Sequence, residues 1–210
     1  ILKNLRYCNL YGTFYICSRW GILFSHPADY TPVCTTELGM AAKQAPEFKK
    51  RGVKMIALSC DSVTDHNGCL EDIKDSSGEA GDWPYPIIAD KNRELAIKFG
   101  MLDPEEKDKA GLPLTARCVF IVGPDKKLKL SILYPATTGR NFDEILRVID
   151  SLQLTATKKV ATPVNWTHGG KCMVLPSIKK EDESKYFPKG VETVSVPSGK
   201  GYLRYTPQPE

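Results

Sequence analysis

Short apolar runs alternate with helix-like segments from residue 20 to residue 152, and this alternation restricts the chain to a layered α/β fold. The apolar runs have the length of buried strands and comprise Trp20–Ser25, Val53–Cys60, Tyr85–Ala89, Leu114–Val122 and Leu128–Tyr134. Helices are expected between or after them at Pro32–Lys50, from Ser62 onward, at Lys91–Phe99 and at Asn141–Leu152. Strands joined by helical crossovers are parallel, whereas the turn at Gly123–Lys126 predicts an antiparallel hairpin at the sheet edge.

Local signals refine these boundaries. Ser62 and Asp65 have the spacing of a capping box, which predicts a helix start. Pro46 predicts a break or kink just before it in the first helix. The charged stretch Asp103–Gly111 is expected to be a loop. The complete order, β-α-β-α-β-α-β-β-α, resembles a thioredoxin-like fold.

The chain changes character near Thr155. From there prolines recur between short strand-like runs, and one charged helix is expected at Lys179–Tyr186. We therefore expect a first domain over residues 20–154 and a small C-terminal domain or arm over residues 155–210. The first 19 residues form a separate segment. A total of 210 residues is enough for this organisation.

Charge and cysteine usage exclude several classes of protein. The 29 basic and 25 acidic residues are interspersed, so no basic block indicates a nucleic-acid or membrane surface. No run of eighteen apolar residues predicts a membrane span. The seven cysteines form no CxxC pair, so neither a disulfide scaffold nor a metal site is expected. Reduced thiols are typical of a cytoplasmic protein.

One cysteine lies where a thiolate would be stabilised. Thr31 is a favourable N-cap and Pro32 a favourable first helical residue, which places Cys34 in the first turn of a helix. Unpaired backbone N–H groups and the helix dipole favour an anion there. The thiolate is the nucleophilic form of cysteine. A small buried residue is the alternative, but a loop leaving a buried strand is a common place for reactive groups.

Other residues could support this thiol. Thr31 could donate a hydrogen bond to the sulfur or orient a molecule that the sulfur attacks. Arg117, in an otherwise apolar strand, needs an anion to justify its position. Glu37 should be held by a cation from elsewhere in the chain. His26 is either a polar residue at the strand end or a base for Cys34.

The remaining cysteines and histidines give weaker signals. Core or incidental positions are expected for Cys60 and Cys118, and a helix face is possible for Cys69. His66 and His168 have no partner in the sequence and are expected at the surface.

The spacing Pro27-x-x-x-Thr31-x-x-Cys34 matches the signature of the peroxiredoxin family. Long stretches are similar to its one-cysteine class, among them "WGILFSHP", "DYTPVCTTELG", "PIIADKNRELAIKFGMLDPEEKD" and "SGKGYLRYTPQP". The resemblance extends from about Trp20 to the C-terminus. The first 19 residues do not resemble the family's opening strands, so we expect a divergent or truncated N-terminal segment.

The resemblance implies a thiol peroxidase that reduces hydrogen peroxide and organic or lipid hydroperoxides. Cys34 would be the nucleophile and would become a sulfenic acid, the first and reversible oxidation state of a thiol. Thr31 would orient the peroxide, and Arg117 would stabilise the thiolate. In supporting roles, His26 and Pro27 would line the pocket and Glu37 would brace Arg117.

The resemblance also implies how the enzyme is reduced. Thr162 stands where two-cysteine classes have their resolving cysteine, so a one-cysteine cycle is expected without a bound cofactor. An external thiol, such as glutathione or a thiol protein, would reduce the sulfenic acid. Cys172 remains an alternative resolving residue.

The family pattern raises two further expectations. We expect a homodimer through the edge strand Leu128–Tyr134, because an exposed edge must be covered or blunted. Ala28 replaces an arginine of the family, and Gly68 and Cys69 replace a tryptophan and its neighbour, which indicates a less positive pocket and looser packing. The alternative function is that of a non-catalytic truncated variant, which would act as a redox sensor or dimerisation partner.

Overall fold

The computed structural model of the chain describes residues 19–78 and 81–210. The N-terminal segment that was expected to be divergent or truncated, with Cys8 and Cys17, therefore lies outside the described residues, apart from Arg19. The chain divides into two compact units, the first ending at Phe142 and the second beginning at Asp143. In the described residues no helix is both long and apolar enough to cross a bilayer. The domain boundary after residue 154 stays a prediction.

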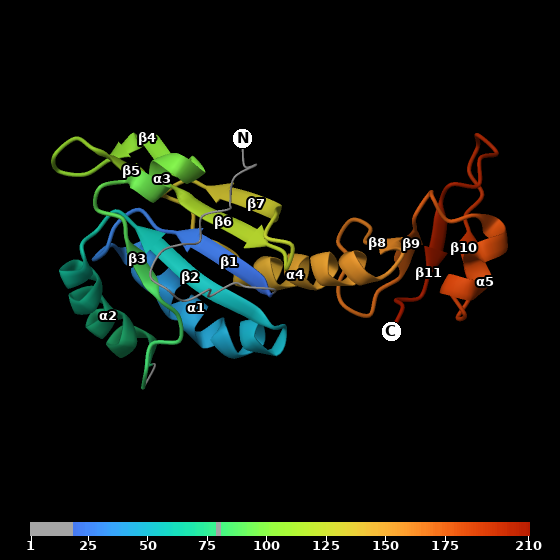
Figure 1. The fold of residues 1–210 in the computed structure, drawn as a ribbon, viewed down its shortest axis with the longest axis horizontal. Helices are drawn as coiled ribbons and strands as arrows, with labels where there is room; N and C mark the ends of the chain where they lie inside the picture. The colour runs from blue at the N-terminus through green and yellow to red at the C-terminus, as the bar shows by residue number, and fades with distance from the viewer. Residues whose placement is uncertain (1–18, 79–80) are drawn as a thin grey trace. The chain divides into compact units, whose positions relative to one another are not determined.

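A five-stranded mixed sheet forms the centre of the first unit (Figure 1). Its order is β3-β2-β1-β6-β7, with β3 at Ile87–Ala89, β2 at Val53–Ser59, β1 at Trp20–Ser25, β6 at Arg117–Val122 and β7 at Leu128–Tyr134. The strands β1, β2 and β3 are parallel, whereas β6 is antiparallel to both β1 and β7. The predicted α/β arrangement with an antiparallel hairpin at one edge is therefore confirmed.

Two helices lie side by side on one face of this sheet. Helix α1 (Pro32–Lys50) has Thr31 as its N-cap and proline at its first position. It runs through Pro46 without interruption, so the predicted break is wrong. Packing of its apolar face, which includes Phe48, outweighs the lost hydrogen bond. Helix α2 (Val63–Ser77) begins at the predicted capping box, and it contacts α1.

The opposite face carries α3 (Glu94–Phe99) and a small two-stranded sheet of β4 (Leu102–Lys107) and β5 (Pro113–Thr115). The prediction of a loop at Asp103–Gly111 is therefore wrong for the residues that form β4. The backbone of β4 pairs with β5 although its sequence is polar. The single strand predicted at Leu114–Val122 is also wrong. It divides at Ala116, whose N–H donates to Met101 O at 2.8 Å, and this bond leads the chain from one sheet to the other.

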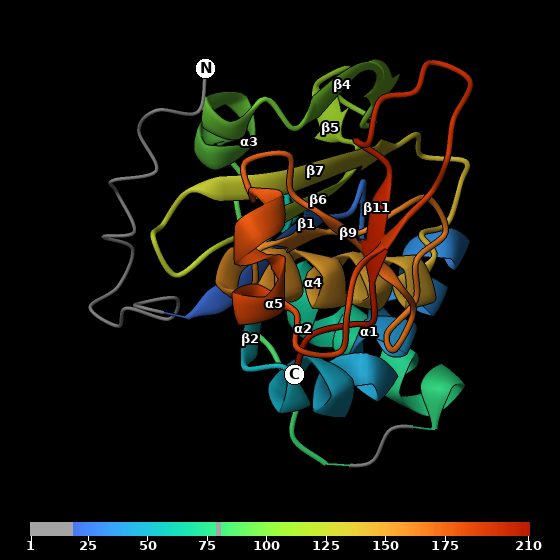
Figure 2. The ribbon, with the colours of Figure 1, turned by 90° about the vertical axis from the view of Figure 1, so that its right-hand side faces the viewer.

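The second unit begins at the second residue of α4 (Phe142–Thr157), a helix that ends five residues later than predicted. A four-stranded sheet follows, of β10 (Glu192–Thr193), β11 (Arg204–Thr206), β9 (Cys172–Val174) and β8 (Val160–Ala161) in that order. Figure 2 shows β9 and β11 of this sheet together with α5. The predicted helix Lys179–Tyr186 is a 3₁₀ turn, η1 (Lys180–Asp182), followed by the short α5 (Glu183–Tyr186). A separate core includes Trp166, Cys172 and Phe187.

Candidate active site

Three buried hydrogen bonds hold the carboxyl end of β1 against the start of β6. The Ser25 hydroxyl donates to Ala116 O at 2.6 Å and accepts the N–H of Cys118 at 3.1 Å. The Thr115 hydroxyl donates to His26 O at 2.6 Å. The register pairs Phe24 with Val119, so its continuation places Arg117 opposite His26. Residues that are far apart in the sequence therefore meet where the loop leaves β1.

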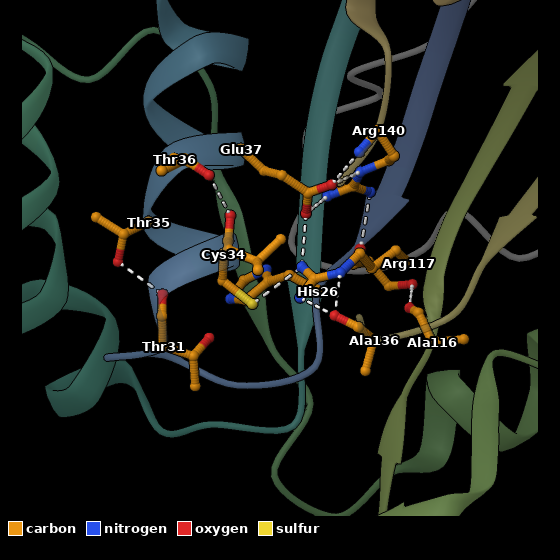
Figure 3. Close-up of polar contacts among 12 residues, drawn as sticks. His26, Thr31, Cys34, Thr35, Thr36, Glu37, Ala116, Arg117, Ala136 and Arg140 are labelled. Atoms are coloured by element: carbon orange, nitrogen blue, oxygen red, sulfur yellow. Dashed lines mark hydrogen bonds and ion pairs between the residues drawn. The ribbon is translucent and has the colours of Figure 1, made fainter. Parts of the chain in front are cut away.

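Cys34 lies in the first turn of α1, and its side chain faces Arg117 (Figure 3). The residue is 1% exposed, and Arg117 Nη1 donates to its sulfur at 3.2 Å. The sequence predicted that Arg117 needs an anionic partner. The structure places Arg117 in contact with the Cys34 sulfur. The remaining nitrogens of Arg117 donate to Ala136 O, at 2.9 Å from Nε and 2.6 Å from Nη2, which fixes the plane of the guanidinium.

Glu37 connects Arg117 to a second buried arginine that sequence analysis missed. Its Oε2 accepts from Arg117 Nη1 at 2.7 Å and from Arg140 Nη2 at 2.8 Å. Its Oε1 accepts the Arg140 backbone N–H at 2.7 Å and Nε at 3.0 Å. All three residues are buried. Sequence analysis predicted one cation beside Glu37, and the structure places two there, Arg117 and Arg140.

The charged groups of this cluster do not balance one another. Two guanidinium groups share one carboxylate, and buried charges are stable only when they are paired. The Cys34 sulfur is a further hydrogen-bond acceptor of Arg117 in this cluster.

Thr31 and Pro27 lie in the loop between β1 and α1. The Thr31 hydroxyl donates to Ala28 O at 2.8 Å, and this bond fixes its position half-buried at the start of the helix. No hydrogen bond joins this hydroxyl to the Cys34 sulfur in the described part of the chain. Of the two roles predicted for Thr31, orientation of a bound molecule therefore fits this geometry better. Pro27 is buried beside His26.

His26 contacts a carboxylate rather than the thiol. Its Nε2 lies 2.9 Å from Asp29 Oδ1, and His66 Nδ1 lies 2.6 Å from Asp29 Oδ2. His66 is 5% exposed, so the prediction that it lies at the surface is wrong. His66 can be buried on α2 because its ring nitrogen is paired with the Asp29 carboxylate.

Hydrogen bonds from the two imidazoles outweigh the cost of burying the Asp29 carboxylate. Burial alone would raise the pKa of Asp29, but the hydrogen bonds from His26 and His66 lower it from 3.8 to about 2. Burial alone would lower the pKa of His66, but the hydrogen bond and charge of Asp29 raise it above 6.5. The folded protein therefore holds a proton on His66 more tightly than a free imidazole does.

This pairing makes stability depend on pH. A proton that binds the folded state more tightly stabilises it below the unfolded pKa, and the stabilisation is lost as pH rises through the folded pKa. We expect the free energy of unfolding to fall more in wild type than in His66→Gln as the pH rises above about 6.5. Urea unfolding measures it, with the exposed His168→Gln as control. Equal slopes in wild type and His66→Gln would contradict the assignment.

The same three residues are the candidate metal ligands of the described chain. The ligand atoms of His26, Asp29 and His66 lie within 4.8 Å of one another. The two histidine nitrogens among them already contact the Asp29 carboxylate. A hydrogen-bonded charge cluster therefore accounts for the arrangement.

The other described cysteines are buried and free. Burial raises the pKa of Cys60 to about 11 and raises those of Cys69, Cys118 and Cys172. These thiols are protonated at neutral pH. Cys34, in contrast, accepts a hydrogen bond from Arg117. The core positions predicted for Cys60 and Cys118 are confirmed.

Comparison with known proteins agrees with this site. Residues 14–131 match the AhpC/TSA family, and residues 151–189 match the C-terminal domain of 1-Cys peroxiredoxin. Peroxiredoxin-6 of Gallus gallus is 69% identical over 198 residues, which cover 93% of this chain and 88% of the relative. This chain belongs to the one-cysteine class of the peroxiredoxin family. Peroxiredoxin-6 of Homo sapiens is 67% identical with the same coverage.

Solved peroxiredoxin structures share the fold. A cysteine-to-serine mutant of the peroxiredoxin 6 of Arenicola marina has a TM-score of 0.91 at 65% identity, covering 93% of this chain and 89% of its own. A yeast mitochondrial 1-Cys peroxiredoxin has a TM-score of 0.82 at 42% identity, covering 92% and 88%. The chain is therefore a thiol peroxidase with a thioredoxin-like fold, as predicted, which favours an enzyme over the non-catalytic alternative.

Proposed function

We propose that Cys34 is the peroxidatic nucleophile of this peroxiredoxin and that Arg117 stabilises its thiolate. The contact of 3.2 Å between Arg117 Nη1 and the Cys34 sulfur, inside a buried cluster, is the observation that supports the proposal most directly. A cationic hydrogen-bond donor held in place before the reaction lowers the barrier where charge develops.

The reaction transfers one oxygen atom from the peroxide to sulfur. The thiolate attacks the distal peroxide oxygen, an S–O bond forms, and the O–O bond breaks. The departing alkoxide or hydroxide takes up a proton and leaves as an alcohol or water, and Cys34 remains as a sulfenic acid. Thr31 orients the peroxide, Glu37 braces Arg117, and His26 and Pro27 line the pocket. Hydrogen peroxide and organic or lipid hydroperoxides are the proposed substrates.

An external thiol, with glutathione as the first candidate, supplies the electrons in place of a bound cofactor. The first thiol forms a mixed disulfide with Cys34 and releases water, and a second thiol releases Cys34. The yeast mitochondrial relative resolves its thiol through glutathione and thioredoxin systems, which supports the proposal. We expect multiple turnovers of hydrogen peroxide with glutathione, measured by coupled NADPH oxidation. Consumption that stops after one equivalent, while the thioredoxin system sustains turnover, would contradict glutathione as reductant.

We also propose a homodimer through β7. This strand lies at the edge of the sheet, and its Leu133 side chain is 70% exposed. An edge strand with free backbone groups and an apolar side chain is suited to pairing with a second copy. Sedimentation velocity should show a dimer, and Leu133→Lys should shift it toward monomer, with Lys127→Ala in the neighbouring turn as control. A wild-type monomer would overturn this proposal.

We also propose that the protein is located in the cytoplasm. Its described cysteines are free, and free cysteines are typical of a reducing compartment. Fractionation of cells that express the natural protein tests this, and enrichment in a secreted fraction would contradict it.

A further inference from the structure

A tight turn precedes α1 and determines where the Thr31 hydroxyl lies. Asp29 and Tyr30 are the two central residues of this turn. The Thr31 hydroxyl donates across the turn to Ala28 O at 2.8 Å. In the proposed mechanism this hydroxyl orients the peroxide, so the shape of the turn determines where the peroxide is held.

The turn has a backbone conformation that needs support from its surroundings. Tyr30 has a φ of 55°, which lies in the left-handed region that favours glycine. A residue with a side chain keeps such a conformation only where neighbouring contacts hold it. The polar groups of Asp29 and Tyr30 make these contacts.

The Asp29 carboxylate joins the turn to two other parts of the fold. Its Oδ1 lies 2.9 Å from Nε2 of His26, which follows β1, and its Oδ2 lies 2.6 Å from Nδ1 of His66 on α2. The three side chains are at most 5% exposed. Burial raises the pKa of Asp29, but the imidazole hydrogen bonds bring it down to about 2, so the carboxylate is ionised and accepts from both rings.

Backbone N–H groups of the turn are also held. The Asp29 N–H donates to Asp61 Oδ2 at 3.0 Å, and the same oxygen accepts the Ser59 hydroxyl at 2.6 Å, at the end of β2. The Tyr30 N–H donates to the Cys69 sulfur on α2 at 3.3 Å. Hydrogen bonds to an ionised group are stronger than those between neutral groups. The contacts of the Asp29 carboxylate are therefore the main support of the turn.

The Cys34 sulfur is held by other contacts. Arg117 Nη1 donates to it at 3.2 Å and to Glu37 Oε2 at 2.7 Å. These residues belong to α1 and β6 rather than to the turn. A change in the turn should therefore displace the Thr31 hydroxyl more than it displaces the sulfur.

We propose that Asp29 and His66 are positioning residues for the peroxide reaction, an inference that rests on the peroxidase chemistry proposed above. Their hydrogen bond fixes the turn on α2, and the turn fixes the Thr31 hydroxyl that orients the peroxide. Displacement of a positioning group by about 1 Å can lower a rate about 100-fold. Loss of this contact should therefore slow the reaction with peroxide although the nucleophile is still present.

Two reactions of Cys34 in the full chain distinguish positioning from a general loss of structure. Hydrogen peroxide depends on the Thr31 hydroxyl, whereas iodoacetamide alkylates the thiolate without it. His66→Leu removes the nitrogen that binds Asp29, and it should lower the rate constant for peroxide about 10-fold or more relative to that for iodoacetamide. His66→Asn should restore most of this ratio, because its amide N–H can replace the Nδ1 donor. Stopped-flow mixing and peptide mapping measure both rates.

Ser62→Ala is the matched control on the same helix. The Ser62 hydroxyl accepts the Asp65 N–H at 3.2 Å and caps α2. Its replacement weakens α2 but leaves the Asp29 carboxylate in place, so the ratio of the two rate constants should stay at the wild-type value. Asp61→Ala removes the acceptor of the Asp29 N–H from a half-buried position. It should lower the ratio as well, and it replaces His66→Leu if that variant does not fold.

The outcomes separate the two proposals. A wild-type ratio in His66→Leu, or in Asp61→Ala where it takes its place, would overturn the positioning role and leave the peroxidase proposal intact. An equal fall of the ratio in Ser62→Ala, or no recovery in His66→Asn, would do the same. A wild-type chain whose Cys34 is alkylated by iodoacetamide but does not react with peroxide would overturn the peroxidase proposal itself.

Discussion

Replacement of Cys34 by serine is expected to lower the rate of peroxide consumption by about 10³-fold or more, because a hydroxyl is not a nucleophile toward peroxide at neutral pH. The other described thiols cannot compensate. With a pKa of about 11, only about one Cys60 in 10⁴ is a thiolate at pH 7. Stopped-flow measurement with hydrogen peroxide gives the rate, and dimedone labelling followed by peptide mapping gives the position of the sulfenic acid.

Cys60→Ser is the matched control for this experiment. Cys60 is buried like Cys34 but lies in the core cluster under α3, and no arginine of the described residues donates a hydrogen bond to its sulfur. Its replacement should leave the rate unchanged. Serine at position 34 preserves a hydrogen-bond acceptor for Arg117, so loss of activity would report on the sulfur itself. Consumption within a few-fold of wild type, or a label on another cysteine, would disprove the assignment of Cys34.

Sequence patterns predicted the elements whose side chains carry a periodic signal. Each strand of the central sheet was found because its apolar run is continuous or nearly so. Strand β4 was missed, since its pairing with β5 uses backbone groups and its side chains are mostly polar. The division at Ala116 was missed as well. It depends on hydrogen bonds to Met101 and Ser25, which are distant in the sequence.

The site followed the same rule. The position of Cys34 could be predicted because Thr31 and Pro32 are local signals for a helix start. Arg117 could be predicted because a charge in an apolar strand needs a partner. Arg140 is 103 residues from Glu37, in a polar segment where an arginine is unremarkable. His66 likewise has exposed neighbours, and its partner Asp29 is 37 residues away.

The Arg140 result changes what Glu37 is expected to do. Sequence alone suggested a brace for Arg117, whereas the structure gives Glu37 two guanidinium groups and a backbone N–H. The carboxylate therefore joins the second turn of α1 to both the start of β6 and the segment before α4. A residue with these contacts affects the stability of the fold as well as the reactivity of Cys34.

Glu37→Gln is expected to lower the free energy of unfolding by about 3 to 5 kcal/mol, because it leaves two buried arginines without their shared counter-ion. The amide keeps the size of the side chain, but its NH₂ group would face a guanidinium donor. The reaction with peroxide should also slow, since Arg117 loses the partner that fixes Nη1 toward the sulfur. Urea unfolding monitored by circular dichroism measures the first effect, and stopped-flow kinetics the second.

Glu47→Gln is the matched control, in the same helix and with the same change of charge. Glu47 pairs with Arg51 at 2.6 Å, but its side chain is 44% exposed, so solvent screens the interaction. Its replacement should shift the urea midpoint far less and leave the peroxide rate unchanged. If the two variants lose equal stability, the charge cluster at Glu37 does not hold the N-terminal part of α1 in place. If Glu37→Gln is destabilised but reacts at the wild-type rate, Arg117 keeps its position without Glu37, and the contact with Ala136 O is sufficient to orient it.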